Sequence, residues 1–285
     1  MTKTILIFLI STFSAFSQEV EVSLHYTINK ENFYNIKVDN FQSIDSQSVH
    51  NQTEFQVTHK LVENSSDGLL FSWKFSNYQV PDELKGISKE FEKLNEGLEI
   101  KYYTTQEGIY KTIENWDEVL DFFTKKLKKL EQDFWGDELT KAQIKSVEKN
   151  LLTPEKLSEY LLTEIILFHN FYGAKLTLNK ELINSLEIDD QYLSIKLPVL
   201  NKSTLSKENQ NYKLNIVEFI DQLKADRIIN ELVKKENLDK ISYTNNQNFQ
   251  YTFNNEFQLI NLSYKKFIEI NNQTLSKEVL IKKID

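Results

Sequence analysis

The four histidines are the first side chains to test for chemistry, because imidazole can act as a metal ligand, a base or an acid. They stand at positions 25, 50, 59 and 169, and no pair has zinc-motif spacing such as His-Glu-x-x-His. His50 and His59 are nine residues apart on a predicted strand, an odd offset that places them on opposite faces. The sequence therefore predicts no metal site, and histidines that are exposed or capped.

Glu164 and His169 share one predicted apolar helix and are the best candidates for a buried acid or base. They are five residues apart, which separates them by about 140° around the helix axis, so they do not face one another. The simpler interpretation puts Glu164 at an edge of the core and His169 in a hydrogen bond near the helix end. The functional alternative is a buried group with a shifted pKa.

Other patterns of catalysis and cofactor binding are missing. The six glycines form no phosphate-binding loop and no Gly-x-Ser-x-Gly elbow. Asp117-Glu118 fits a helix N-terminus and Asp189-Asp190 a solvated turn. Hydrolysis by two carboxylates far apart in sequence stays open as an alternative. We expect no cofactor and assign no catalytic residue.

The charge of the chain argues against nucleic-acid binding. The sequence has 34 basic and 42 acidic residues, a net charge of −8, and Arg227 is its only arginine. Guanidinium is the usual group for bidentate phosphate recognition. We therefore expect no nucleic-acid partner.

Aromatic residues are the one positive indication of a ligand site. They recur on two predicted strands and on the apolar helix, and a sheet lined with aromatics can hold an apolar ligand. Such a ligand would lie between the sheet and that helix. A fully packed core is the ordinary alternative. The candidate lining residues are Trp73, Phe75, Tyr102, Phe168 and Phe171.

Strands are predicted in the first third of the chain. Residues 20–28 alternate between apolar and polar side chains, as a strand with one buried face does. A hairpin is predicted around residues 65–68, where Asp67-Gly68 supplies the positive φ of the turn, and a second one around residues 106–108.

Helices follow in the middle of the chain. Asn115 can cap a helix whose apolar residues, from Trp116 to Leu130, lie on one face. The second helix runs over residues 154–172, with Thr153 as cap and Pro154 at its first position. Its apolar residues lie nearly all round, so we expect it at the centre of the core.

Strand-like pieces return between residues 174 and 200, and Ile220, Leu223, Ile228 and Leu232 predict one more helix. Residues 240–285 read as a meander of strands 249–253, 257–270 and 274–284. Strands at both ends with helices between them predict an α+β fold: an antiparallel, curved sheet from N- and C-terminal strands with a helical middle segment packed on it.

The domain prediction is a signal peptide at residues 1–17 and one α+β domain at 18–285. Within the domain we distinguish an N-terminal β region (18–113), a helical middle (115–173), a mixed region (174–239) and the meander (240–285). No Ser/Gly/Pro-rich linker divides it, and two domains are the alternative.

The first 17 residues have the pattern of a secretion signal. Lys3 precedes an apolar run centred on residues 5–10, and the small residues Ala15 and Ser17 place the cut between Ser17 and Gln18. Residues 14–19, taken together with the Lys-, Asn- and Ile-rich composition of the whole chain, resemble exported proteins of the Bacteroidetes group. That resemblance implies a periplasmic or extracellular location. The run is too short for a membrane anchor, so we expect no span after cleavage.

The sequence thus favours an exported, non-catalytic protein that acts by binding or assembly. Its partner would be an apolar small molecule or an envelope protein. The predicted architecture is similar to the half-barrels of bacterial periplasmic lipoprotein carriers, although no motif supports that likeness. A carrier of an apolar ligand or lipid is one alternative, and a carboxylate-dependent hydrolase is the other.

Overall fold

The fold is taken from a computed structural model of the chain. The signal peptide predicted at residues 1–17 lies outside the residues that the structure describes. Those residues are 18–45, 47–81, 86–134, 136–190, 192–237 and 239–284.

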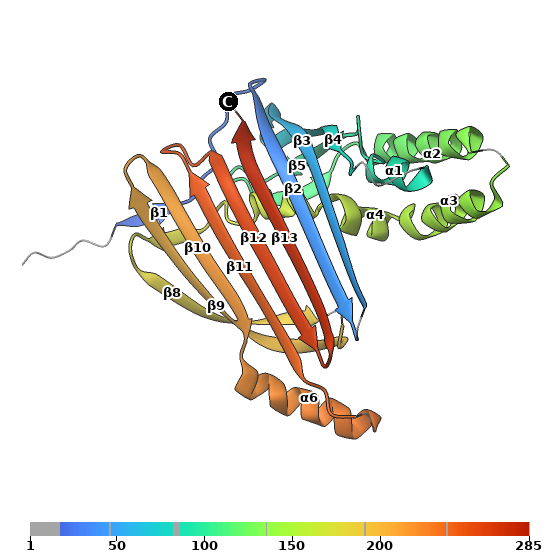
Figure 1. Cartoon of the computed structure of the whole chain (residues 1–285). Helices are drawn as coiled ribbons and strands as arrows, with labels where there is room; N and C mark the ends of the chain where they lie inside the picture. Colours follow the sequence, from blue (N-terminus) through green and yellow to red (C-terminus); the bar gives the residue numbers. More distant parts are fainter. Residues whose placement is uncertain are drawn as a thin grey trace, which may run out of the picture.

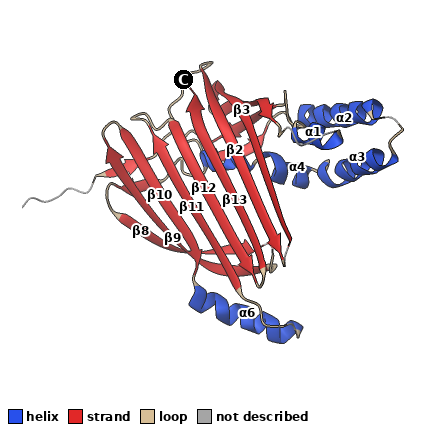
Figure 2. Cartoon of the chain, viewed as in Figure 1, coloured by secondary structure: helices blue, strands red, loops and turns tan. Residues whose placement is uncertain are grey.

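A sheet of eleven antiparallel strands dominates the described chain (Figures 1 and 2). Its order is β6-β5-β4-β3-β2-β13-β12-β11-β10-β9-β8, so the N- and C-terminal strands meet at β2 and β13. Two short strands, β1 (Glu19–Glu21) and β7 (Lys175–Thr177), pair separately. The eleven strands are β2 (Glu31–Ile44), β3 (Gln47–Ser65), β4 (Gly68–Gln79), β5 (Glu99–Thr104), β6 (Tyr110–Ile113), β8 (Glu181–Asp190), β9 (Ile195–Glu208), β10 (Asn211–Ile220), β11 (Tyr243–Phe253), β12 (Leu259–Ile270) and β13 (Gln273–Ile284).

Both predicted hairpins are confirmed. Strands β3 and β4 turn at Asp67-Gly68, and Gly68 has a φ of 135°. A Cβ at this glycine would lie 2.1 Å from the carbonyl oxygen of Thr104, so the turn requires glycine for space as well as for φ. The second hairpin joins β5 and β6 across residues 106–108. Each of the three predicted C-terminal strands overlaps an observed one.

Six helices are described: α1 (Ile87–Glu92), α2 (Trp116–Asp133), α3 (Glu138–Leu151), α4 (Pro154–Leu161), α5 (Thr163–His169) and α6 (Gln222–Glu236). Helices α1 to α4 are grouped at one side of the sheet, and α6 lies at the ends of β10 and β11 (Figures 1 and 2). No helix in the described part of the chain is long and apolar enough to cross a membrane.

Two helix predictions need correction. The predicted helix 154–172 is interrupted at Leu162 and ends at His169, which lets apolar residues of both segments, α4 and α5, reach the core. Helix α6 exists, but it buries Ala225 and Ile229, whereas Leu223 is 80% exposed. The sequence prediction counts Ile220 in the apolar face of this helix, but Ile220 is the last residue of β10.

The main core lies on one face of the sheet, against α2, α4 and α5. Alternation along β2 directs Tyr34, Ile36 and Val38 to this face, and α5 contributes Ile165 and Phe168 from the other side. A smaller apolar cluster, which includes Tyr243, packs against α6. Between the main core and the cluster at α6, the same face of the sheet carries polar side chains.

Candidate functional site

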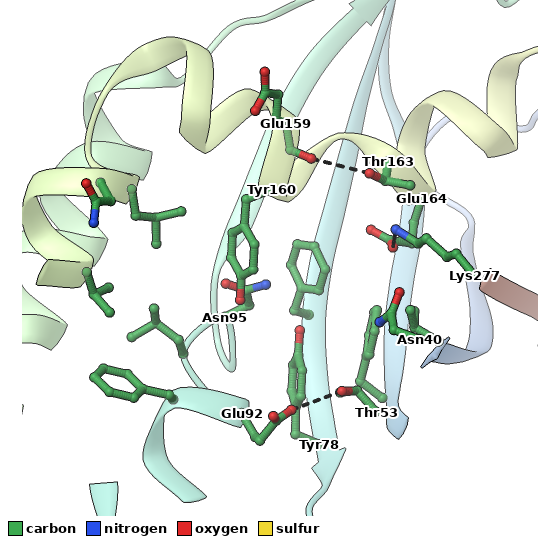
Figure 3. Close-up of a pocket in the computed structure, with 18 of the residues that line it drawn as sticks. Asn40, Thr53, Tyr78, Glu92, Asn95, Glu159, Tyr160, Thr163, Glu164 and Lys277 are labelled. Carbon is green, nitrogen blue, oxygen red and sulfur yellow. Dashed lines mark hydrogen bonds and ion pairs between the residues drawn. The ribbon is translucent and has the colours of Figure 1, made fainter. Parts of the chain in front are cut away.

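A cavity of about 670 Å³ opens where the sheet meets the helices (Figure 3). Strands β2, β3, β4 and β13 form one wall, and α1, α3, α4 and α5 form the other. Its lining residues are Val38, Asn40, Thr53, Phe55, Phe75, Tyr78, Phe91, Glu92, Leu94, Asn95, Ser146, Val147, Asn150, Leu151, Glu159, Tyr160, Thr163, Glu164 and Lys277.

Aromatic rings form much of the cavity wall. Phe55 stacks on Tyr78 with ring centroids 4.8 Å apart, and Phe75 lies 5.6 Å from Phe55. Tyr160 faces them from α4 (Figure 3), and burial raises the pKa of its hydroxyl to about 12. This wall suits an apolar ligand, because rings offer large surfaces that leave water readily.

Polar groups are placed singly around these rings. Glu164 is buried, with the Lys277 ammonium at 4.0 Å; burial raises its pKa, and Lys277 opposes the rise. The Oδ1 atom of Asn95 is buried and, among the described residues, has no hydrogen-bond partner. Glu92 accepts a 2.9 Å bond from Thr53. The cavity therefore offers both apolar surface and groups that can orient a ligand.

The five aromatic residues singled out in the sequence do not form one lining. Phe75 lies in the cavity wall. Trp73, Tyr102 and Phe168 are buried in the core, where the ring of Phe168 packs edge-on at 5.4 Å from that of Trp73. Phe171 is half-buried against Tyr251, at 4.5 Å between ring centroids.

A buried chain of hydrogen bonds joins His59, Tyr102 and His169. The Tyr102 hydroxyl lies 2.8 Å from Nε2 of His169 and 3.0 Å from Nε2 of His59, and Nδ1 of His169 lies 2.8 Å from the carbonyl oxygen of Gly108. A carbonyl only accepts, so Nδ1 of His169 carries the proton and Nε2 accepts from Tyr102. The tyrosine oxygen then accepts from Nε2–H of His59, which leaves Nδ1 of His59 unprotonated.

Burial keeps this chain neutral. It lowers the pKa of His169 to about 4 and that of His59 well below 6.5, while it raises the pKa of Tyr102. Nδ1 of His59 and Nε1 of Trp73 are buried without partners in the described structure. The sequence predicted an exposed or capped His59, but the structure buries it. It follows Phe55 and Val57 at inward positions of β3, so the strand alternation could have shown it.

Other residues named from the sequence have structural roles. His50 is exposed on the face opposite to His59 and contacts Asp39 at 2.8 Å. Asp117 and Glu118 lie in the first turn of α2, as predicted. Asp190 is not in a solvated turn: it is buried and accepts hydrogen bonds from the Tyr243 hydroxyl and two backbone N–H groups.

Metal ligation and sequence similarity add no assignment. Among the described residues, no three His, Cys, Asp or Glu side chains are grouped closely enough to hold a metal ion. No protein-family model matches the chain, and no curated protein matches it in sequence. The geometry of the cavity is therefore the feature that points to a function.

Proposed function

We propose that this is an exported, non-catalytic binding protein that holds an apolar or amphipathic small molecule in the cavity between the sheet and helices α3 to α5. One observation carries the proposal: a cavity of about 670 Å³ with an aromatic wall and a few convergent polar groups. Ligand sites for small molecules are typically about 300–1,000 Å³ and have this mixed lining.

The energetics of burial support such a ligand. Removing about 300 Å² of apolar ligand surface from water stabilises a complex by roughly 7 kcal/mol, before the costs of association. The Glu164 side chain supplies a polar contact within the same space.

A curved sheet would help to enclose the ligand, and one placement supports curvature. Tyr192, in the turn after β8, lines a smaller cavity together with Asn40 of β2. Six strand spacings separate β2 from β8, which in a flat sheet amounts to about 29 Å. A strand arrangement that brings these residues to one cavity is what a half-barrel carrier would need.

The binding proposal can be tested with a neutral fluorescent probe such as N-phenylnaphthylamine. Ser146→Trp places a large ring at the exposed mouth of the cavity, whereas Lys145→Trp, next to it on α3, lies outside the lining. We expect saturable binding by the native protein, at least about tenfold weaker binding by Ser146→Trp and native-like binding by Lys145→Trp. No saturable binding, together with no ligand in native mass spectra of detergent-free protein, would refute the proposal.

A carboxylate-dependent hydrolase is the second candidate, favoured by the raised pKa of Glu164 inside a cavity. A carboxyl group whose pKa is raised by burial can act as a general acid. Screening the protein against esters and glycosides tests this candidate. Turnover that is abolished in Glu164→Gln would replace the binding proposal with catalysis.

A further inference from the structure

Two lysines face each other on the inner side of the sheet. Lys266 on β12 and Lys277 on β13 are direct cross-strand partners. Each belongs to the inward-facing set of its strand, because Tyr264 and Val279, two residues away, are buried. Side chains that oppose each other in this way have Cβ atoms about 5 Å apart, and like charges there are destabilising.

The space around the two lysines is a second cavity, of about 320 Å³. None of its lining residues is Asp or Glu. Its polar lining residues are Asn40, Gln42, Asn51, Tyr192, Ser276 and the two lysines. Asn40 and Lys277 also line the first cavity, so the two cavities meet at these residues.

No residue that lines this cavity carries a negative charge to balance the two lysines. Within the described chain neither ammonium group makes a hydrogen bond, and Lys277 has only the 4.0 Å contact with Glu164, on the side of the first cavity. Burial lowers the pKa of Lys266. The Asp190 carboxylate opposes this lowering, and the weaker repulsion from Lys277 adds to it. In a chain of net charge −8, a cavity with two cations and no lining carboxylate indicates an anionic occupant.

We infer that the second cavity binds the anionic head of an amphiphile, a carboxylate or a phosphate, whose apolar chain occupies the first cavity. This rests on the proposed function and names its ligand class. An anion between Lys266 and Lys277 accepts charge-assisted hydrogen bonds from both ammonium groups and removes their repulsion. The amides of Asn40 and Asn51 can donate to its remaining oxygen atoms.

The experiment compares ligands that share one alkyl chain: decanoate, decyl phosphate, decanol and decylamine, each measured by displacement of the neutral probe. We expect the two anions to bind at least about tenfold more tightly than decanol, with decylamine weakest. Lys266→Gln and Lys277→Gln should each reduce this preference, the ratio of anion affinity to decanol affinity, about tenfold. Lys265→Gln is the matched control, because Lys265 points to the outer face and pairs with Glu278 at 3.0 Å.

Four outcomes would overturn the inference. Equal affinities for decanoate and decanol would show that the ligand needs no anionic head, and would leave the proposed function intact. Both cavity lysine variants could keep the anion preference while their urea transitions show that they are folded. That result would mean that the anionic head binds outside the second cavity. Binding of inorganic phosphate alone, with no gain from an alkyl chain, would make the site one for small anions. Failure of all four ligands and of the probe would refute the proposed function itself.

Discussion

The neutral histidines buried beneath the sheet should make the stability of this protein fall as the pH drops from 6.5 to about 4. His169 has a pKa of 6.5 when solvated and about 4 in the fold, where burial disfavours its charged form. In this pH window His169 is protonated in the unfolded chain but not in the folded chain, so lowering the pH favours unfolding. The stabilisation is complete above pH 6.5 and is lost as the pH falls toward 4.

The magnitude follows from the size of the shift. Each pH unit between the two pKa values costs about 1.4 kcal/mol of unfolding free energy, so His169 contributes about 3 kcal/mol over the window. The pKa of His59 is lowered for the same reason, and this histidine adds to the effect in the same direction. The loss is a large share of a typical stability of about 5–15 kcal/mol.

Urea unfolding followed by tryptophan fluorescence, at a series of pH values from 6.5 downward, measures this slope. His169→Gln should lower stability at neutral pH and flatten the slope by about 1.4 kcal/mol per pH unit. Tyr102→Phe leaves both histidines in place but removes the hydroxyl that bonds to the Nε2 atom of each. It should cost about 1–3 kcal/mol at neutral pH and retain a steep slope.

The control for loss of a histidine is His50→Gln, because the His50 ring lies at the surface on the same strand as His59. It should keep the native slope. Identical slopes for the native protein and His169→Gln between pH 6.5 and about 5, above the range of most carboxylates, would refute the buried neutral chain.

Two further predictions concern the core and the N-terminus. Ile165→Ala and Phe168→Ala should each lower the unfolding free energy by about 2–5 kcal/mol, because both side chains are buried. Ile166→Ala on the same helix, 44% exposed, should lose far less, and losses below about 0.5 kcal/mol at both buried sites would contradict a central α5. Mass spectrometry of protein from its native host should find Gln18 at the N-terminus; retained Met1 would remove the export proposal.

Local features of this protein could be predicted from the sequence alone. The turn at Asp67-Gly68, the helix that starts after Asn115 and the cap and proline at residues 153–154 all depend on neighbouring residues, so short-range patterns suffice to find them. The same holds for the antiparallel α+β class, because strand and helix periodicities are properties of single segments. The alternation of apolar residues along β3 could even have predicted that His59 is buried.

Tertiary structure alone decided which of these segments meet. Strand β2 pairs with β13 from the far end of the chain, and the register of that pair carries Lys277 to the cavity beside Asn40. His59, Tyr102 and His169 come from β3, β5 and α5 and meet only when those elements pack. Contacts of this kind depend on strand order, register and the angle between helices, and no local pattern encodes these, because many packings satisfy the same periodicity.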